Sequence, residues 1–130
     1  MEGQVVLLDS SVLIDYFRKP NKEKTFLIAL IDSGHTFRIS AVTVFEVYAG
    51  APDTQLGFWT GVLKGVEVIP FGPREAMRAA ALVKEMKANR KQLASPDLFI
   101  AATAIEAGLP VATLDRRHFG YVPGVVLVEG

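Results

Sequence analysis

The chain has 130 residues, half of them hydrophobic, with 14 basic and 14 acidic side chains and no cysteine. Its length favours one domain over residues 1–130, and at this size about two-thirds of the unfolded surface can be buried without cross-links. The absence of cysteine excludes a disulfide-rich scaffold, a thiolate zinc site and a cysteine nucleophile, and zero net charge excludes nucleic-acid binding through a globally basic surface.

Short β-branched runs alternate with longer helical patterns, without an internal repeat or a linker. In chain order, the patterns predict a strand at 4–8, helices at 10–17 and 21–33, a strand at 36–39, helices at 42–49 and 54–64, a strand at 66–69, helices at 73–90 and 97–107, and strands at 111–114 and 125–128. This alternation predicts an α/β fold, with a mostly parallel central sheet flanked by helices on both faces. Ligands bind such sheets beyond the carboxyl ends of the strands, where the strand order reverses.

No segment of the sequence is typical of a membrane span. The longest uncharged apolar run, residues 98–105, is far shorter than the ~20 residues that a span needs. The run at 5–8 ends at Asp9 and is too short for the core of a signal peptide. Together with the lack of cysteine, these features favour a cytoplasmic protein that contacts no membrane.

Two acids follow predicted strands directly. Asp9 comes after the strand at 4–8, and Asp115 after the strand at 111–114. If these strands are parallel neighbours, their carboxylates come within reach of one another, and Thr113 lies on the same side as Asp115. The alternative is that each aspartate only caps the helix that follows it.

Two further acids occur on apolar helices. Glu46 shares a helical stripe with Val42, Phe45 and Ala49, where a carboxylate needs a cation, a hydrogen-bond donor or water. The alternative is a boundary glutamate that reaches solvent or pairs with an arginine. Asp97 follows a helix start at residues 95–96, where the helix dipole favours an acid, but the helix after it has hardly any polar face. We therefore expect Asp97 to face the interior or a cleft.

Four carboxylates that converge without basic partners cannot all stay ionised unless a cation lies among them. Carboxylate oxygens alone favour hard ions such as Mg²⁺ or Mn²⁺, which bind through a few carboxylates together with substrate phosphate. The predicted chemistry is hydrolysis of phosphodiesters by a metal-activated water.

Four segments resemble, in order, the four motifs of PIN domains. They are VLLDSSVLID at 6–15, SAVTVFEVYAG at 40–50, PDLFIAATA at 96–104 and ATLDRRHF at 112–119. Within that family the chain is most similar to the VapC toxins of toxin–antitoxin pairs. The resemblance implies a PIN-like nuclease domain over 1–130 that is a Mg²⁺- or Mn²⁺-dependent endoribonuclease, usually dimeric and held inactive by a cognate VapB antitoxin. Carried over by position, the metal-site acids are Asp9, Glu46, Asp97 and Asp115, and Thr113 is a hydroxyl that supports the last acid.

Residues near these motifs receive weaker predictions. Arg116 and Arg117 follow Asp115 directly and are candidates for contacts to RNA phosphates. His118 is expected to be structural rather than a general base, and Asp15 to be solvated. A final group, Lys84, Lys87, Arg90 and Lys91, forms either a basic ridge or a solvated helix end.

The helix at 54–64 is apolar on two sides, with Leu56, Trp59 and Leu63 on one face and Phe58 and Val62 on another. This pattern predicts either deep burial or a contact with a second copy or an antitoxin.

Two functions of other classes compete with the nuclease. One is a PIN-like binding module for RNA or protein without catalysis, whose sign would be a lost acid, and no acid is lost. The other is aspartate-based phosphotransfer, which usually needs a second aspartate two positions after Asp9, where this chain has Ser11.

Overall fold

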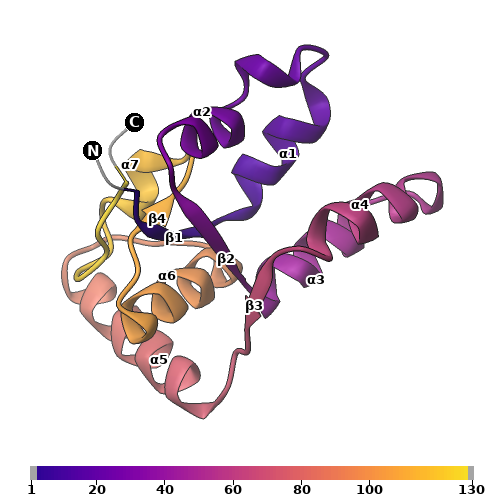
Figure 1. The fold of residues 1–130 in the computed structure, drawn as a ribbon. Helices are drawn as coiled ribbons and strands as arrows, with labels where there is room; N and C mark the ends of the chain where they lie inside the picture. The colour runs from indigo at the N-terminus through magenta and orange to yellow at the C-terminus, as the bar shows by residue number, and fades with distance from the viewer. Residues whose placement is uncertain (1–2, 129–130) are drawn as a thin grey trace.

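A computed structural model describes residues 3–128 of the chain. Four parallel strands form its sheet in the order β3-β2-β1-β4 (Figure 1). They are β1 (Val5–Leu8), β2 (Thr36–Ser40), β3 (Glu67–Ile69) and β4 (Val111–Ala112). The chain builds outward from β1 to β2 and β3, and then crosses to the other side of β1 for β4. The strand order therefore reverses between β1 and β4, which is where open α/β sheets bind ligands.

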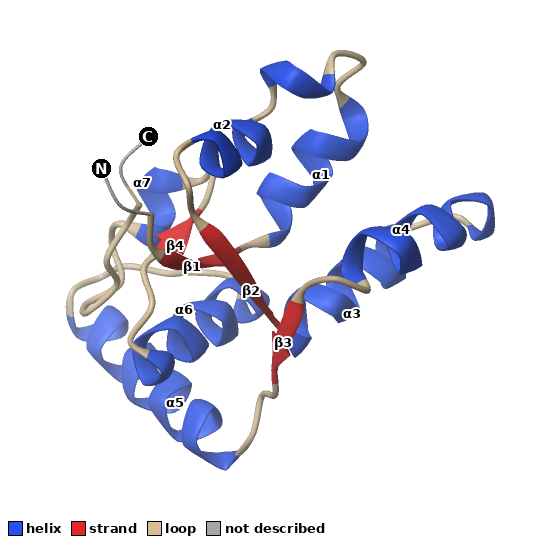
Figure 2. Ribbon diagram, viewed as in Figure 1, coloured by secondary structure: helices blue, strands red, loops and turns tan. Residues whose placement is uncertain are grey.

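Helices cover both faces of this sheet, as the sequence predicts (Figure 2). They are α1 (Ser10–Arg18), α2 (Phe26–Asp32), α3 (Ala41–Gly50), α4 (Leu56–Leu63), α5 (Pro73–Ala88), α6 (Ser95–Ala107) and α7 (Arg116–Phe119), with short 3-10 helices η1 (Lys22–Lys24) and η2 (Asp53–Gln55). None of the described helices is long and apolar enough to cross a membrane.

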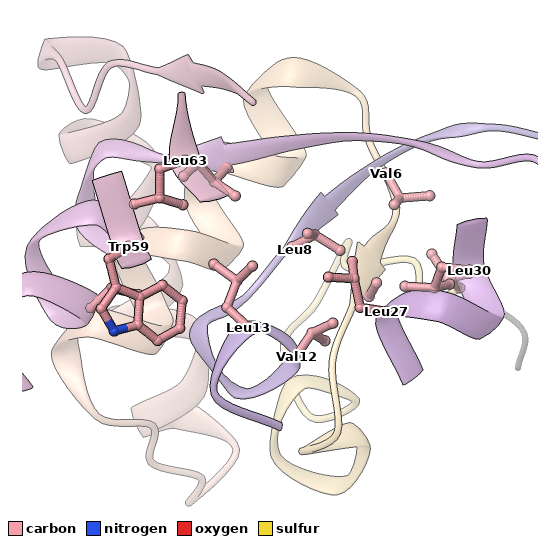
Figure 3. Packing of buried hydrophobic residues seen from close by; sticks show 12 residues of the cluster. Val6, Leu8, Val12, Leu13, Leu27, Leu30, Trp59 and Leu63 are labelled. Atoms are coloured by element: carbon pink, nitrogen blue, oxygen red, sulfur yellow. The ribbon is translucent and has the colours of Figure 1, made fainter. Parts of the chain in front are cut away.

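The central strand β1 is buried on both faces because its side chains alternate between two cores. Val6 and Leu8 belong to the core that α1 to α4 cover, which Figure 3 shows with Leu13 and Trp59. Leu7 belongs to the core on the opposite face, under α5, α6 and α7. This double burial explains why β1 is a continuous apolar run, and it fixes the direction in which Asp9 leaves the sheet.

Helices α3 and α4 extend together away from the rest of the fold (Figure 1). The two apolar sides of α4 have different environments. On the first side, Trp59 and Leu63 are buried in the chain's own core and Leu56 is 37% exposed. On the second side, Val62 packs against that core and Phe58 is 37% exposed. Phe58 meets Phe17 of α1 edge to face, with 4.9 Å between ring centroids. Burial thus accounts for most of the apolar side chains of α4, and the exposed parts of Leu56 and Phe58 are its remaining apolar surface.

Three expected elements differ from the structure. The helix expected at 21–33 is divided into η1 and α2, because Thr25 is extended and the Lys22 ammonium donates to the carbonyl oxygens of Tyr16 and Phe17 at the end of α1. The strand expected at 125–128 is only an isolated bridge between Val111 and Leu127. The strand expected at 111–114 ends at Ala112, because the next backbone N–H groups bond to side-chain hydroxyls.

Candidate active site

Asp9 follows β1 directly, is only 3% exposed, and its carboxylate is surrounded by hydroxyl groups. Its Oδ1 accepts hydrogen bonds from the Ser11 backbone N–H (3.1 Å) and the Ser11 hydroxyl (2.5 Å). Its Oδ2 accepts one from the Thr113 hydroxyl (2.6 Å). Burial raises the pKa of Asp9, and these hydrogen bonds oppose that rise because they stabilise the carboxylate. Asp9 is thus the N-cap of α1, which was the alternative prediction from the sequence. It is also held by Thr113, which follows β4.

Two hydroxyls join the start of α1 to the segment that follows β4. The Thr113 oxygen also accepts the Asp115 backbone N–H (2.9 Å), and the Ser11 oxygen accepts the Leu114 backbone N–H (3.0 Å). The predicted adjacency of the two strand ends is confirmed by the pairing of Leu8 with Ala112. Sequence reasoning missed Ser11, although a serine two positions after a strand-end aspartate is the ordinary signal of such a turn.

Glu46 lies on α3 and reaches toward the same region. The Ser10 hydroxyl donates to its Oε1 at 3.2 Å. Burial is the main cause of a raised pKa for Glu46, and the negative charges of Asp97 and Asp9 raise it further. Within residues 3–128, no lysine or arginine forms an ion pair with Glu46. The structure therefore gives no support to the alternative of a glutamate paired with arginine. Ser10, which sequence reasoning also missed, holds this carboxylate in place.

Asp97 lies in the first turn of α6 and is half-buried. Burial raises its pKa first, and the charges of Asp9 and then Asp115 raise it further, while His118 lowers it. Asp115 is held from its other side, since the His118 Nδ1 lies 2.8 Å from Asp115 Oδ1. Asp97 is close enough to Asp9 and Asp115 for their charges to affect its pKa, and it lines a cavity together with Asp115.

Asp97, Asp115 and His118 line a cavity of about 530 Å³. We call it the α5–α6 pocket, because its remaining walls come from the end of α5, the connection to α6 and the start of α6. The other residues that line it are Val83, Met86, Lys87, Lys91, Gln92, Leu93, Ala94, Ser95 and Leu98.

The four acids suit a divalent cation by their chemistry. All their donor atoms are carboxylate oxygens, and within the described chain none of the four pairs with a lysine or an arginine. Asp9, Glu46 and Asp97 have raised pKa values, so an added positive charge would relieve an existing strain. In residues 3–128, however, no three acidic or histidine side chains are close enough to form a preassembled metal centre. The donor set fits Mg²⁺ or Mn²⁺, and its side chains would have to draw together around the ion.

Two arginines near the site have partners within the chain. Arg116 Nη1 donates to the carbonyl oxygen of Val128 at 2.6 Å, and Arg117 Nε donates to the hydroxyl of Tyr121 at 2.9 Å. Both side chains remain exposed. The first contact ties the end of the described chain to α7, and the second leaves Arg117 without a carboxylate partner among residues 3–128.

The expectation that Asp15 is solvated is wrong. Its side chain is 11% exposed, its Oδ2 accepts the backbone N–H of Phe26 at 3.2 Å, and Lys19 lies 3.1 Å away. Phe26 is the first residue of α2, whose free N–H groups favour a carboxylate. Asp15 therefore connects α1 to α2 and takes no part in the acid cluster.

Comparison with known proteins agrees with this geometry. The family model of the PIN domain matches residues 6–124. Ribonuclease VapC19 of Mycobacterium tuberculosis is 25% identical over 117 residues, which cover 90% of this chain and 94% of that protein. A toxin–antitoxin complex from Klebsiella pneumoniae contains a chain that is 32% identical, with a TM-score of 0.74 and coverage of 93% of this chain and 95% of that one. VapBC2 from Rickettsia felis, bound to a DNA fragment from its promoter, has a similar fold, with a TM-score of 0.82, 19% identity and coverage of 95% and 97%.

Proposed function

This chain belongs to the PIN domain family, and from that membership we propose an endoribonuclease that is the toxin of a VapBC-type toxin–antitoxin pair. The observation that carries the proposal is the arrangement of four acids around the β1/β4 strand ends without a basic partner in the described chain. We assign the domain to residues 1–130 and its place of action to the cytoplasm, where RNA substrates are found.

The proposed metal ligands are Asp9, Glu46, Asp97 and Asp115, which would hold one or two Mg²⁺ or Mn²⁺ ions. Such an ion, when bound, activates water and neutralises charge that develops on a phosphodiester. The chain's own hydroxyls do the positioning. Ser11 and Thr113 occupy both oxygens of Asp9 from the interior, and Ser10 orients Glu46. The products expected from hydrolysis by water are a 5′-phosphate and a 3′-hydroxyl.

The acids also define what the competing function would look like. A PIN-like binding module without catalysis needs none of these acids, whereas this chain keeps all four, and the charges of Asp9 and Asp115 add to the effect of burial in raising the pKa of Asp97. Retaining such strain is costly unless a ligand relieves it. This relationship favours the nuclease over the binding module.

We propose that the partner is a VapB-type antitoxin and that two toxin chains form a dimer. A cavity of about 220 Å³ between α1, α3 and α4 is lined by Phe17, Trp59 and, toward the acids, Glu46. An apolar segment of an antitoxin could occupy it and would continue onto the exposed face of Phe58. Coexpression of the chain with the product of its neighbouring gene, followed by light scattering, tests both assemblies. If the chain is a monomer both when purified alone and when coexpressed with that product, the proposed dimer and the proposed antitoxin complex are contradicted.

The nuclease proposal is tested by cleavage of labelled total RNA in Mn²⁺, Mg²⁺ or EDTA. We expect cleavage by the wild type in at least one metal, none in EDTA, and none by Asp9→Asn. Asp53→Asn is the matched control, because Asp53 is an exposed acid in η2, and it should cleave normally. Absence of cleavage by folded, antitoxin-free wild type favours the binding module. Equal cleavage by Asp9→Asn, or ends with a 2′,3′-cyclic phosphate, contradicts the site or the mechanism.

A further inference from the structure

The α5–α6 pocket carries charges of both signs. Asp97 and Asp115 line it, and so do the exposed residues Lys87 and Lys91. Within residues 3–128 neither lysine has a carboxylate within ion-pair distance. A pocket of about 530 Å³ lies within the roughly 300–1,000 Å³ range of small-ligand sites. The pocket therefore combines candidate metal ligands with free positive charge in a space that suits a small ligand.

The backbone positions Lys91 by a reversal at the end of α5. Arg90 has a left-handed conformation with φ of 57°, and the Lys91 N–H donates to the Met86 carbonyl at 2.8 Å. A residue other than glycine in this conformation is uncommon, and here it closes the helix with the hydrogen bond of a Schellman motif. The turn directs the chain back along α5, so that Lys91 and Lys87 line the same pocket.

Tyr121 holds two cations near this pocket without neutralising either. The Lys91 Nζ lies 4.2 Å from the centroid of the Tyr121 ring, and Arg117 Nε donates to the Tyr121 hydroxyl. A cation–π contact and a hydrogen bond to an uncharged hydroxyl orient these side chains without supplying a negative charge to either. The contact with Tyr121 thus orients the Lys91 side chain at the wall of the pocket.

The pocket also has an apolar part. Met86 and Leu98 are buried beneath it, and Leu93 is half-buried. A nucleotide matches both parts of this pocket. Its phosphate can contact the lysines, and the face of its base can lie against the aliphatic side chains. Asp97 and Asp115, which line the same pocket, are two of the proposed metal ligands, and a bound metal ion would hold the scissile phosphodiester next to them.

We propose that the α5–α6 pocket binds the nucleotide next to the scissile phosphodiester, with its phosphate at Lys87 and Lys91 and its base against Leu93. This inference rests on the proposed ribonuclease function and adds the substrate subsite. It also separates the basic residues at the end of α5 into two groups. Lys87 and Lys91 line the pocket, whereas Lys84 and Arg90 do not.

That separation supplies a charge-matched experiment. Lys87→Gln with Lys91→Gln and Lys84→Gln with Arg90→Gln each remove two positive charges from the same region. Binding of fluorescein-labelled hexaribonucleotides, one homopolymer of each base, is measured by fluorescence anisotropy in EDTA across a salt series. Cleavage of the same RNAs in Mg²⁺ or Mn²⁺ gives kcat and KM for each variant.

We expect the Lys87/Lys91 variant to bind roughly tenfold or more weakly and to reduce the slope of log affinity against log salt by about 0.7, since the two lysines contact one phosphate and each single-strand phosphate contributes about 0.7. Its KM should rise more than its kcat falls. The Lys84/Arg90 variant should retain both slope and KM. Equal effects of the two variants would overturn the subsite in favour of diffuse charge attraction. If binding in EDTA is too weak to measure, an unchanged KM for the Lys87/Lys91 variant would overturn it instead.

The base contact has its own test. Leu93→Ala should change the order of affinity among the four homopolymers while it leaves the salt slope unchanged, because it removes apolar surface and no charge. An unaltered order contradicts the contact with the base. Wild type that cleaves RNA while the lysine variant behaves normally disproves only the subsite. Wild type that neither binds nor cleaves RNA contradicts the proposed function as well.

Discussion

The hydroxyl of Thr113 lies 2.6 Å from Asp9 Oδ2 and joins two residues that are 104 positions apart in the sequence. The same oxygen accepts the backbone N–H of Asp115 at 2.9 Å. One side chain therefore positions two of the four candidate metal ligands. Because Asp9 is buried and its pKa is raised, this hydrogen bond is one of the few interactions that favour the ionised carboxylate.

Replacement of Thr113 by valine keeps the shape of the side chain and removes its hydroxyl. We expect Thr113→Val to lower the free energy of unfolding by about 1–3 kcal/mol, because a buried carboxylate loses a donor and the Asp115 N–H loses an acceptor. RNA cleavage should fall with it, at equal folded concentration. Urea unfolding and cleavage rates measure the two effects.

The matched control is Thr103→Val. Thr103 is also buried, but its hydroxyl donates only to the Phe99 carbonyl of its own helix at 2.7 Å. That variant should cleave RNA normally. If both valine variants lose the same stability and the same activity, Thr113 has only a packing role.

Asp97 is predicted to reduce stability in the metal-free protein. Its half-buried carboxylate is destabilised by burial and by the charges of Asp9 and Asp115. Asp97→Asn removes one of the repelling charges, so we expect the melting temperature in EDTA to rise. The corresponding gain in the free energy of unfolding is about 1 kcal/mol or less, because the charge is partly solvated. Cleavage should be abolished. A variant that is both inactive and less stable than wild type would contradict the repulsion, and Asp53→Asn should change neither property.

The raised pKa values predict an unusual pH dependence without metal. Asp9, Glu46 and Asp97 bind a proton more tightly in the folded than in the unfolded protein. Their contribution to stability is fully present below the unfolded pKa and is lost as the pH rises through the folded pKa. We therefore expect the free energy of unfolding in EDTA to increase as the pH is lowered from 7 toward these raised values. Urea titrations at several pH values measure it.

A triple variant, Asp9→Asn, Glu46→Gln and Asp97→Asn, isolates this effect from all other titrating groups. The rise in stability should be absent from it. Glu106 acts in the opposite direction, because Arg78 and Arg74 lower its pKa, but only near and below its ordinary pKa of 4.5. Parallel curves for wild type and the triple variant between about pH 7 and pH 5 would show that the acids are not strained in the folded state.

Asp15 supports the fold and not the chemistry. Asp15→Ala removes the acceptor of the Phe26 N–H at the start of α2, and we expect a loss of about 1 kcal/mol, the usual size of a helix-cap interaction. Cleavage per folded molecule should be unchanged. Asp32→Ala, at the exposed end of the same helix, is expected to cause no loss, because an acid there opposes the helix dipole. Reduced cleavage by folded Asp15→Ala would assign this acid to the site after all.

The main features of the site were predictable because each depends on local pattern and general topology. Asp9 and Asp115 follow apolar strands, and parallel strands end at one edge of the sheet. Asp97 was conspicuous as an acid on an apolar helix. Glu46 was predicted on weaker grounds, because Phe45 of the same stripe is 67% exposed and Glu46 is only partly buried, as the boundary alternative held. The alternation of strands and helices likewise predicts the two-sided covering that the structure has.

The remaining features depend on tertiary contacts that no local pattern contains. The burial of Asp15 comes from α2, which packs against α1, so its position six residues after Asp9 gave no indication of it. The division between Lys87 and Lys91 on the one hand and Lys84 and Arg90 on the other follows from a left-handed Arg90, which lacks the glycine that usually marks such a turn. The 125–128 segment has strand propensity, yet only one bridge to Val111 forms.

The position of β1 between β2 and β4 has a consequence for the protein's synthesis. A ribosome makes Asp9 104 residues before Thr113, and the two meet only after β4 has paired with β1. A nascent chain that stops before residue 111 leaves one edge of β1 open and the Asp9 carboxylate without its hydroxyl partner. The candidate site therefore cannot be complete until the chain has been made through β4 and the Thr113 that follows it.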